Sequence, residues 1–357
     1  MKLVFFFILR IILYPIMLII NLTIFVRNWL YDKNILKSVR PKVFCINVGN
    51  LNLGGTGKTP HVEYLVRLLA DNYKTSILSR GYKRKTKGFV WADATATAES
   101  IGDEPMQYFL KFKDKINVVV CEDRIVGVNE IQRQMPNIET EIQSIVLLDD
   151  AFQHRKIAPQ LNLLLCDYNR PFYEDSLVPF GKLRDLRQSA KRANAVIVTK
   201  CPKDINIQKH TAIINGIKKY VSPETPIFFS RINYKSVVGY FSKNTFKPQQ
   251  KSNVVTAIAK PEVFIEYLSE QGFSINNVHN FSDHFSFTRK EMNEIITETA
   301  QFKNVLQIIT TEKDMVKIKP LLNEEEMKHF FYVPIEIELE DKKTFDDFVY
   351  SSLKNLA

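Results

Sequence analysis

A cluster of glycines between an apolar, strand-like run and a helix-period segment is the feature that most constrains the fold. The 357 residues include only 12 glycines, yet four of them fall within nine positions: Gly49, Gly54, Gly55 and Gly57. Glycine allows the backbone to curl so that several N–H groups point at one centre. A loop of this kind between a strand and a helix is typical of a phosphate-binding loop at the edge of a parallel sheet.

Two residues at the end of this loop have side chains suited to a nucleoside triphosphate. Lys58 can reach the β- and γ-phosphates, and the Thr59 hydroxyl can ligate Mg²⁺. The strict pattern G-x-x-x-x-G-K-[ST] requires glycine where this chain has Asn52, so an ordinary glycine-rich turn is the alternative. We predict that ATP is bound by the following residues: Asn52, Leu53, Gly54, Gly55, Thr56, Gly57, Lys58 and Thr59.

Short β-branched runs alternate with helix-period segments on both sides of the loop. This alternation is typical of a parallel sheet with crossover helices. The expected strands cover residues 43–48, 75–78, 117–120, 144–148, 161–165 and 195–199. We therefore predict a P-loop NTPase-like α/β domain over residues 31–201. Strand-like runs resume near residue 227, which predicts a second, smaller α/β domain over residues 202–357 with a boundary that the pattern leaves open.

An apolar strand that ends in Asp149 and Asp150 is the expected metal end of the site. Carboxylates at the end of a strand hold Mg²⁺ in many phosphoryl-transfer enzymes. We predict that Thr59, Asp149 and Asp150 bind Mg²⁺, and Gln153 and His154 lie within one further turn. The alternative is a strand end followed by an ordinary acidic turn.

Two polar segments remain ambiguous from spacing alone. Five basic residues and no acid lie between residues 80 and 91, which fits either a solvated loop or a site for an anionic substrate. The turn at residues 102–105 leads into an apolar helix, and Asp103 in it is either the N-cap of that helix or a functional carboxylate.

The chain begins with an apolar run over residues 3–26. A helix of that length would reach about 36 Å, against a hydrocarbon core of about 30 Å. Arg10 and Pro15 suit a helix that lies in the membrane interface as well as one that spans the bilayer. We predict a membrane-anchoring helix over residues 1–30 and leave these two arrangements open, with a buried core helix as a further alternative.

The distribution of charge and the spacing of the cysteines indicate the cellular compartment in which the protein works. Seven basic residues and one acid in residues 1–42 supply +6 of the formal net charge of +10. A basic flank beside an apolar helix predicts that the body of the protein is cytoplasmic, and it leaves little excess charge for nucleic acid. The four cysteines form no CxxC pair, which indicates reduced core residues in a reducing compartment.

An ordered series of motifs follows the apolar segment. They are GGTGKTP (54–60), SRGYK (79–83), GDEP (102–105), DDAFQHR (149–155), PFGKLRD (179–185), Asp283-His284 and TEKD (311–314). In this order they resemble the tetraacyldisaccharide 4'-kinase family, the lipid A kinases of the Gram-negative inner membrane. The resemblance implies transfer of the γ-phosphoryl group of ATP to the 4'-hydroxyl of a tetraacylated disaccharide 1-phosphate. It also implies Mg²⁺ and a location on the cytoplasmic face of the inner membrane.

The resemblance further assigns roles to single residues. Asp103 would be the catalytic aspartate and His284 its partner at the sugar hydroxyl. Lys58 and Thr59 would remain on the phosphates and Mg²⁺, joined by the side chains of Asp149, Asp150 and Gln153. Arg184 would face the phosphoryl groups or the lipid headgroup. The chain departs from the family pattern at two positions. Ala151 replaces a glycine, which suggests a less strained turn, and Asp185 replaces a glutamate, which leaves the role of that carboxylate open.

Two other functions compete with this interpretation. A regulatory P-loop ATPase of the partitioning type would have an additional lysine where this chain has Leu53. A nucleic-acid-binding module would need interleaved aromatic residues or a zinc motif, and neither is found in the sequence. We therefore expect a lipid kinase that works with ATP and Mg²⁺ at a membrane.

Overall fold

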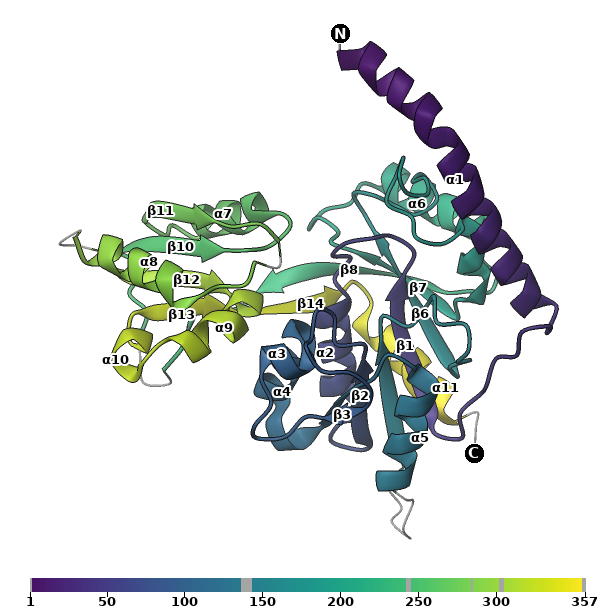
Figure 1. The fold of residues 1–357 in the computed structure, drawn as a ribbon, viewed down its shortest axis with the longest axis horizontal. Coiled ribbons are helices and arrows are strands. Elements are labelled where there is room, and N and C mark those ends of the chain that lie inside the picture. Colours follow the sequence, from purple (N-terminus) through teal and green to yellow (C-terminus); the bar gives the residue numbers. More distant parts are fainter. Residues whose placement is uncertain (1, 136–142, 242–244, 284, 302–304, 355–357) are drawn as a thin grey trace.

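The computed structural model describes residues 2–135, 143–241, 245–283, 285–301 and 305–354, with side chains from residue 14 onward except those of residues 301, 305 and 306. Within these residues, nine strands form one sheet and five form another (Figure 1). The larger sheet has the order β14 (Ile335–Leu339), β8 (Ile227–Tyr234), β7 (Ala195–Thr199), β6 (Leu161–Asp167), β1 (Phe44–Asn50), β5 (Ser144–Asp149), β2 (Lys74–Ser79), β4 (Asn117–Val120) and β3 (Val90–Trp91).

The centre of the larger sheet is parallel and buried, as the apolar runs predicted. β1 pairs with β5 on one side and with β6 on the other, in register such that Val48 lies beside Asp149. Almost every residue of these three strands is buried, which is expected of a parallel sheet covered on both faces. The register brings the carboxyl ends of β1 and β5 to the same edge. That edge is where ligands bind in parallel α/β sheets.

Helices cover the larger sheet on both faces, as a P-loop α/β fold requires. They are α2 (Lys58–Leu69), α3 (Ala98–Ile101), α4 (Asp103–Phe112), α5 (Arg124–Gln134), α6 (Ile207–Lys218) and α11 (Lys342–Lys354), with 3₁₀ turns at η1 (Lys113–Lys115) and η2 (Arg187–Arg192). The apolar face of α2 that includes Val62 and Leu65 is buried against the sheet. The four cysteines carry free thiols, and three of them are buried.

The smaller sheet lies beside the larger one and forms a second unit (Figure 1). Its strands have the order β11 (Ile275–Asn280), β10 (Lys251–Thr256), β12 (Val305–Thr311), β13 (Phe330–Val333) and β9 (Val238–Gly239). Its helices are α7 (Pro261–Glu270), α8 (Arg289–Gln301), α9 (Glu312–Ile318) and α10 (Glu324–Met327), with the 3₁₀ turn η3 (Lys319–Leu321).

Residues 202–357 contribute to both sheets. β8 and β14 pair antiparallel at the edge of the larger sheet, and α11 packs on α2, where the rings of Tyr64 and Phe345 lie 5.8 Å apart. The smaller sheet is therefore formed by chain that leaves the larger unit after β8 and returns to it in β14 (Figure 1).

The N-terminal helix α1 (Lys2–Asp32) attaches to the larger unit by its last turns. The side chain of Asn28 is buried and donates hydrogen bonds to Asp185 at 2.8 Å and Ser189 at 3.2 Å, and Arg155 donates to the Asn28 carbonyl at 3.0 Å. Toward its N-terminal end the helix runs away from the rest of the molecule (Figure 1). In the described part of the chain, no helix meets the length and hydropathy needed to cross a membrane.

Candidate active site

The predicted phosphate-binding loop connects β1 to α2. Gly57 has φ 86° and immediately precedes the first turn of α2, while Gly54 has φ 106°, a conformation that side chains rarely adopt. Apart from each glycine and its two neighbours in the chain, no atom of the described residues lies within 4 Å of a Cβ built on Gly54 or Gly55, so the backbone of the loop borders open space. The first N–H groups of α2 have no partner inside the helix. This arrangement suits an anion such as a nucleotide phosphate.

The first part of the loop is held by the segment that follows β6. Asn52 is buried and donates to Asp175 Oδ2 at 2.9 Å, and the Leu53 N–H donates to the Lys182 carbonyl at 2.6 Å. The carbonyl of Thr56 accepts from the Thr199 hydroxyl at 2.9 Å. These contacts hold the loop against the body of the larger unit. Nucleotide binding by the individual loop residues stays a prediction.

Two cations meet the carboxylate of Asp150 beside this loop. Lys58 Nζ lies 3.6 Å from Asp150 Oδ2, and Arg184 Nη1 lies 3.0 Å from the same oxygen. Burial acts to raise the pKa of Asp150, but the charges of Lys58 and Arg184 outweigh it and lower the pKa below its usual value. The structure thus brings together one predicted metal ligand and two predicted catalytic residues from three separate motifs.

The turn that carries Asp150 accommodates alanine at the family's glycine position. The positive φ of this turn, 56°, belongs to Asp150, and Ala151 is not among the residues with positive φ. The N–H of Ala151 donates to Asn47 Oδ1 at 3.0 Å. A methyl group at position 151 is therefore compatible with the turn.

Asp149 ends β5 and is fully buried at the same edge of the sheet. The Tyr108 hydroxyl donates to its Oδ2 at 3.3 Å, while its Oδ1 has no hydrogen-bond partner among the described residues. Burial raises the pKa of Asp149 to about 7, with a further contribution from the charge of Glu104. A buried carboxylate oxygen without a partner is costly unless a cation binds there.

The other predicted metal-binding side chains are those of Thr59 and Gln153. The Thr59 side chain lies close enough to the Tyr108 hydroxyl to oppose the rise in its pKa that burial causes, and that hydroxyl donates to Asp149. Gln153 donates to the Asn50 carbonyl at 2.8 Å, and its buried Oε1 has no partner in the described part of the chain. The described residues contain no group of three or more His, Cys, Asp or Glu side chains that could hold a metal. Mg²⁺ in phosphoryl-transfer sites uses one or two carboxylates together with phosphate oxygens and water, so this donor set fits Mg²⁺.

The predicted catalytic aspartate, Asp103, is the first residue of α4. The N-cap of this helix is Gly102, with φ 98°, so Asp103 does not occupy the capping position that the sequence left open. A Cβ on Gly102 would lie 3.2 Å from the backbone of Gly81, which shows that the turn at 102–105 packs closely on the basic loop. His284 lies outside the described residues, so its pairing with Asp103 stays a prediction.

The basic loop is divided between structural and exposed cations. Arg84 pairs with Glu122, and Lys85 lies 2.8 Å from Glu99. Lys85 is nevertheless exposed, as are Arg80, Lys83 and Lys87. These exposed side chains fit the predicted role of receiving an anionic substrate.

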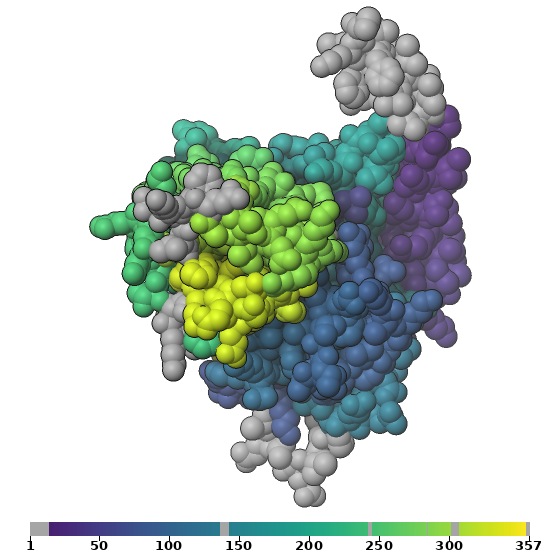
Figure 2. Space-filling view, turned by 60° about the vertical axis from the view of Figure 1, so that its left-hand side comes forward, coloured from purple at the N-terminus to yellow at the C-terminus, as the bar shows by residue number. Residues whose placement is uncertain are grey.

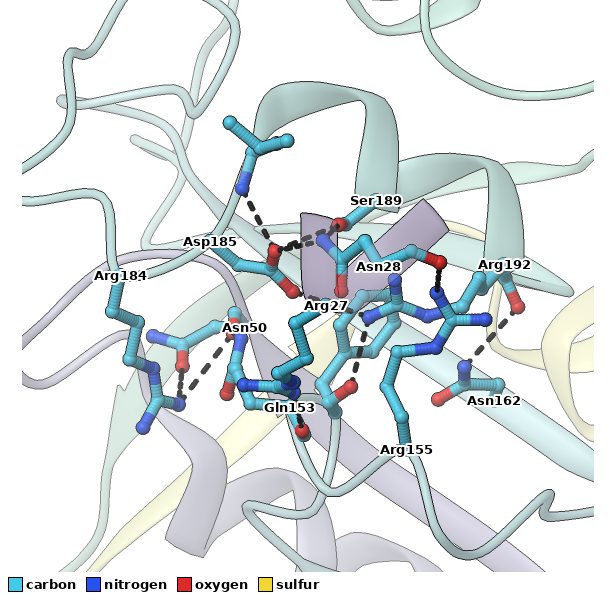
Figure 3. Close-up of polar contacts among 12 residues, drawn as sticks. Arg27, Asn28, Asn50, Gln153, Arg155, Asn162, Arg184, Asp185, Ser189 and Arg192 are labelled. Atoms are coloured by element: carbon cyan, nitrogen blue, oxygen red, sulfur yellow. Dashed lines mark hydrogen bonds and ion pairs between the residues drawn. The ribbon is translucent and has the colours of Figure 1, made fainter. Parts of the chain in front are cut away.

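Arg184 and Asp185 of the LRD motif face opposite ways (Figure 3). Arg184 Nη2 donates to Asn50 Oδ1 at 2.6 Å, on the side of the phosphate-binding loop. Asp185 is 1% exposed and accepts hydrogen bonds at 2.8 Å from both Asn28 of α1 and Ser189. The carboxylate whose role the sequence left open therefore ties α1 to the segment that carries Arg184.

Sequence reasoning missed two residues that contact Asp149. Tyr108 reaches it from the middle of α4, and Arg124 is 3% exposed and donates to its carbonyl at 3.2 Å from the start of α5. Neither residue belongs to a recognisable motif. The only available signal was the apolar helix that follows Asp103, and it does not specify which of its residues turns toward the metal end.

His61 lies behind the loop and leads to a prediction on stability. Its Nδ1 lies 2.7 Å from the Gly57 carbonyl and its Nε2 lies 3.0 Å from Ser230 Oγ. Burial lowers the pKa of His61 from 6.5 to about 4. Between these pH values the unfolded chain binds a proton that the folded chain excludes, so the stabilisation is present above pH 6.5 and is lost as the pH falls.

We expect the free energy of unfolding to fall by about 2–3 kcal/mol more in the wild type than in His61→Asn when the pH is lowered from about 6.5 to 4.5. Urea unfolding of both proteins at both pH values measures this difference, and the ionisation of the carboxylates cancels between them. Equal losses in the two proteins would contradict a buried, neutral His61.

Comparisons with known proteins show the family of this chain. A profile of the tetraacyldisaccharide-1-P 4'-kinase family matches residues 9–354. A tetraacyldisaccharide 4'-kinase of Cytophaga hutchinsonii is 39% identical over 92% of this chain and 91% of its own length. One of Flavobacterium psychrophilum is 40% identical over 96% and 98%.

A solved structure shows the same fold. The crystal structure of LpxK from Aquifex aeolicus in complex with ATP has a TM-score of 0.74 and 27% sequence identity, and covers 96% of this chain and 99% of that one. The motifs, the geometry of the loop and these relatives lead to one assignment. The chain belongs to the tetraacyldisaccharide-1-P 4'-kinase family, and it is a kinase.

Proposed function

We propose how the described residues carry out the family's reaction, the ATP-dependent phosphorylation of the 4'-hydroxyl of tetraacyldisaccharide 1-phosphate in lipid A biosynthesis. The observation that carries this proposal is the meeting of Lys58, Asp150 and Arg184 beside a glycine loop that borders open space. Phosphoryl transfer depends mainly on positioning and on neutralising the charge of the phosphates. Lys58 and Arg184 supply that charge, and the loop N–H groups orient the phosphates.

The acceptor side of the reaction is assigned to Asp103. Its carboxylate would accept the proton of the 4'-hydroxyl while that oxygen forms its bond to the γ-phosphorus of ATP, and the bond to the β-phosphate oxygen breaks to release ADP. Tyr108 on the same helix lies at Asp149, so α4 spans the distance from the acceptor side to the metal end. His284 is proposed as the partner of Asp103.

Mg²⁺ is the proposed metal. Thr59, Asp149, Asp150 and Gln153 would hold it, because Asp149 Oδ1 and Gln153 Oε1 are buried oxygens without a partner among the described residues. When bound, Mg²⁺ neutralises negative charge that develops on the phosphoryl oxygens.

We further propose that the protein works on a membrane surface, on the cytoplasmic side of the inner membrane. From residue 14 onward α1 exposes many large apolar side chains, namely Tyr14, Ile16, Leu18, Ile19, Leu22, Phe25, Val26 and Trp29. A helix that exposes so many apolar side chains fits a lipid interface. Asn28 and Asp185 tie the end of this helix to the catalytic unit, so membrane contact and the acceptor site would stay in a fixed relation.

Deletion of residues 1–23 should move the protein from the membrane fraction to the soluble fraction. The deletion keeps Ile24, which packs on the core of the larger unit, and the buried Asn28. We expect the KM for lipid to rise while the KM for ATP changes less than twofold. The full-length double variant Ile19→Asp, Leu22→Asp is the matched test, because it makes two exposed apolar positions of the helix acidic. If both variants still sedimented fully with membranes in high salt, the main membrane attachment would lie outside this helix.

The reaction itself is tested by separating lipid-stimulated ADP release from basal hydrolysis in the purified protein. A kinase of this family releases ADP in proportion to the lipid acceptor supplied. Basal release that the lipid leaves unchanged would contradict the proposal and favour a regulatory ATPase.

A further inference from the structure

A chain of buried ion pairs joins three helices away from the phosphate-binding loop. Lys111 Nζ of α4 lies 2.7 Å from Glu63 Oε2 of α2 and 2.8 Å from Glu312 Oε1 of α9. The two carboxylate side chains are 1% and 6% exposed. Gln107, one turn before Lys111, donates to the other oxygen of Glu63 at 2.9 Å. We call Glu63, Lys111 and Glu312 the interunit triad.

The three helices of the triad carry different parts of the proposed site. α2 begins at Lys58, on the phosphate side, and α4 begins at Asp103, on the acceptor side. α9 belongs to the smaller unit, and the TEKD motif at its start has no role in the site described above. Lys111 is therefore the residue at which the phosphate side, the acceptor side and the smaller unit meet.

Glu312 is rigidly attached to the smaller sheet. The next acidic residue of the motif, Asp314, is fully buried and accepts hydrogen bonds from the Thr311 hydroxyl at 2.7 Å and from the Ala257 N–H at 3.0 Å. These bonds fix the first turn of α9 between β10 and β12. A contact of Lys111 with Glu312 thus acts on the smaller unit as a whole.

Apolar side chains also contribute to the contact between the units. Met106 and Leu110 of α4 pack against the core of the smaller unit that includes Met315 and Tyr332. In Figure 2 the smaller unit, in green to yellow, abuts the blue part of the larger unit, which includes α4. Apolar contact stabilises association but is not directional, so it does not by itself select one arrangement of two helices.

The ionisation of Glu63 also depends on this contact. Burial raises the pKa of Glu63 to about 7, and the charge of Lys111 opposes this rise. Arg67 is a more distant partner, at 3.8 Å from Glu63, and it also faces Glu336 at 3.7 Å. Buried ion pairs contribute little to net stability, but they can specify one arrangement among several.

We propose that Lys111 is a positioning residue for the phosphoryl transfer. Its two ion pairs fix α4 between α2 and α9. They therefore set the distance of Asp103 from the phosphate-binding loop, and they set the position of the smaller unit on α4. The proposal rests on the roles proposed above for Lys58 and Asp103. It assigns a function to Glu312 of the TEKD motif, as the contact through which the smaller unit is aligned with the acceptor side.

Three substitutions test the proposal. Lys111→Met removes the charge and keeps the length of the side chain, Lys111→Arg restores the charge, and Glu312→Gln breaks only the contact to the smaller unit. Lys115→Met is the matched control, because Lys115 lies four residues further along and pairs with Asp71 in solvent. We expect Lys111→Met and Glu312→Gln to lower kcat by about 10- to 100-fold, since small misplacements of reacting groups cost that much. The KM for ATP should change less than twofold.

Rescue and the double variant separate positioning from simple loss of structure. Lys111→Arg should recover kcat to within about threefold of wild type, and Lys111→Met with Glu312→Gln should lose little more than Lys111→Met alone, because both act through one contact. An unchanged kcat in Glu312→Gln, or a parallel loss of kcat and folded protein without rescue by arginine, would overturn the proposal.

A distance measurement tests the alignment without using activity. Spin labels on cysteines at the exposed positions Gln208 of α6 and Asn293 of α8, in a chain with Cys201→Ser, report the separation of the two units. We expect one narrow distance distribution in wild type and Lys115→Met, and a broadened or shifted one in Lys111→Met and Glu312→Gln. Unchanged distances would refute the alignment even if activity fell. If the wild type fails to phosphorylate the lipid, the proposed function fails while this result still decides the role of the triad.

Discussion

Replacement of Lys58 by alanine should lower the rate of phosphoryl transfer by about 10²-fold or more, because it removes a positioned charge from the phosphates. Lys58 contacts Asp150 at 3.6 Å at the junction of loop and helix, outside the hydrophobic core. Asp150 keeps its ion pair with Arg184 in the variant, so the midpoint of thermal unfolding should change little. Steady-state ADP release with saturating lipid measures the effect.

Lys342→Ala is a suitable control for the Lys58 variant. Lys342 pairs with Asp346 on the surface of α11, and its loss removes a lysine without touching the loop. Near wild-type turnover in a folded Lys58→Ala protein would remove the assignment of the loop as the phosphate site.

Asp103→Asn and His284→Ala should each lower kcat by about 10²–10⁴-fold, the range expected for loss of a general base. Asp103 is not the N-cap of α4, so the asparagine variant should keep the helix and leave the affinity for ATP nearly unchanged. If the two residues act as one unit on the acceptor hydroxyl, the kcat of the double variant should be little lower than that of the less active single variant.

The same variants can also refute the pairing of Asp103 with His284. Losses that multiply would show that Asp103 and His284 act independently. A weakened affinity for ATP in Asp103→Asn would instead place Asp103 on the metal or nucleotide side. Either result would refute the pair while leaving the phosphate-binding loop and the kinase assignment intact.

The central sheet and the phosphate side of the site could be predicted because both depend on local pattern. Strands such as β1 and β5 are continuous apolar runs, and parallel pairing brings their carboxyl ends to one edge. Lys58 and Asp150 must then lie near each other, although 92 positions separate them in the sequence. The fold class and the family followed from these runs and from the order of the motifs.

Contacts that depend on tertiary placement could not be predicted in the same way. The pattern of β14 does not show that it returns to the larger sheet, because an amphipathic strand does not specify its partner. Tyr108 reaches Asp149, and Lys111 reaches Glu312 over 201 positions, only because α4 lies between α2 and α9. Asp185 similarly contacts α1 through a residue, Asn28, that no motif marks.

The most direct test of the account is transfer of a labelled γ-phosphoryl group from ATP to a defined lipid. Wild-type protein should place the label on tetraacyldisaccharide 1-phosphate, and should place none on the analogue that lacks the 4'-hydroxyl. Lys58→Ala should reduce the lipid-bound label by the same factor as ADP release. Label that appears only as inorganic phosphate, at a rate that neither lipid changes, would contradict the assignment of this chain as a lipid kinase.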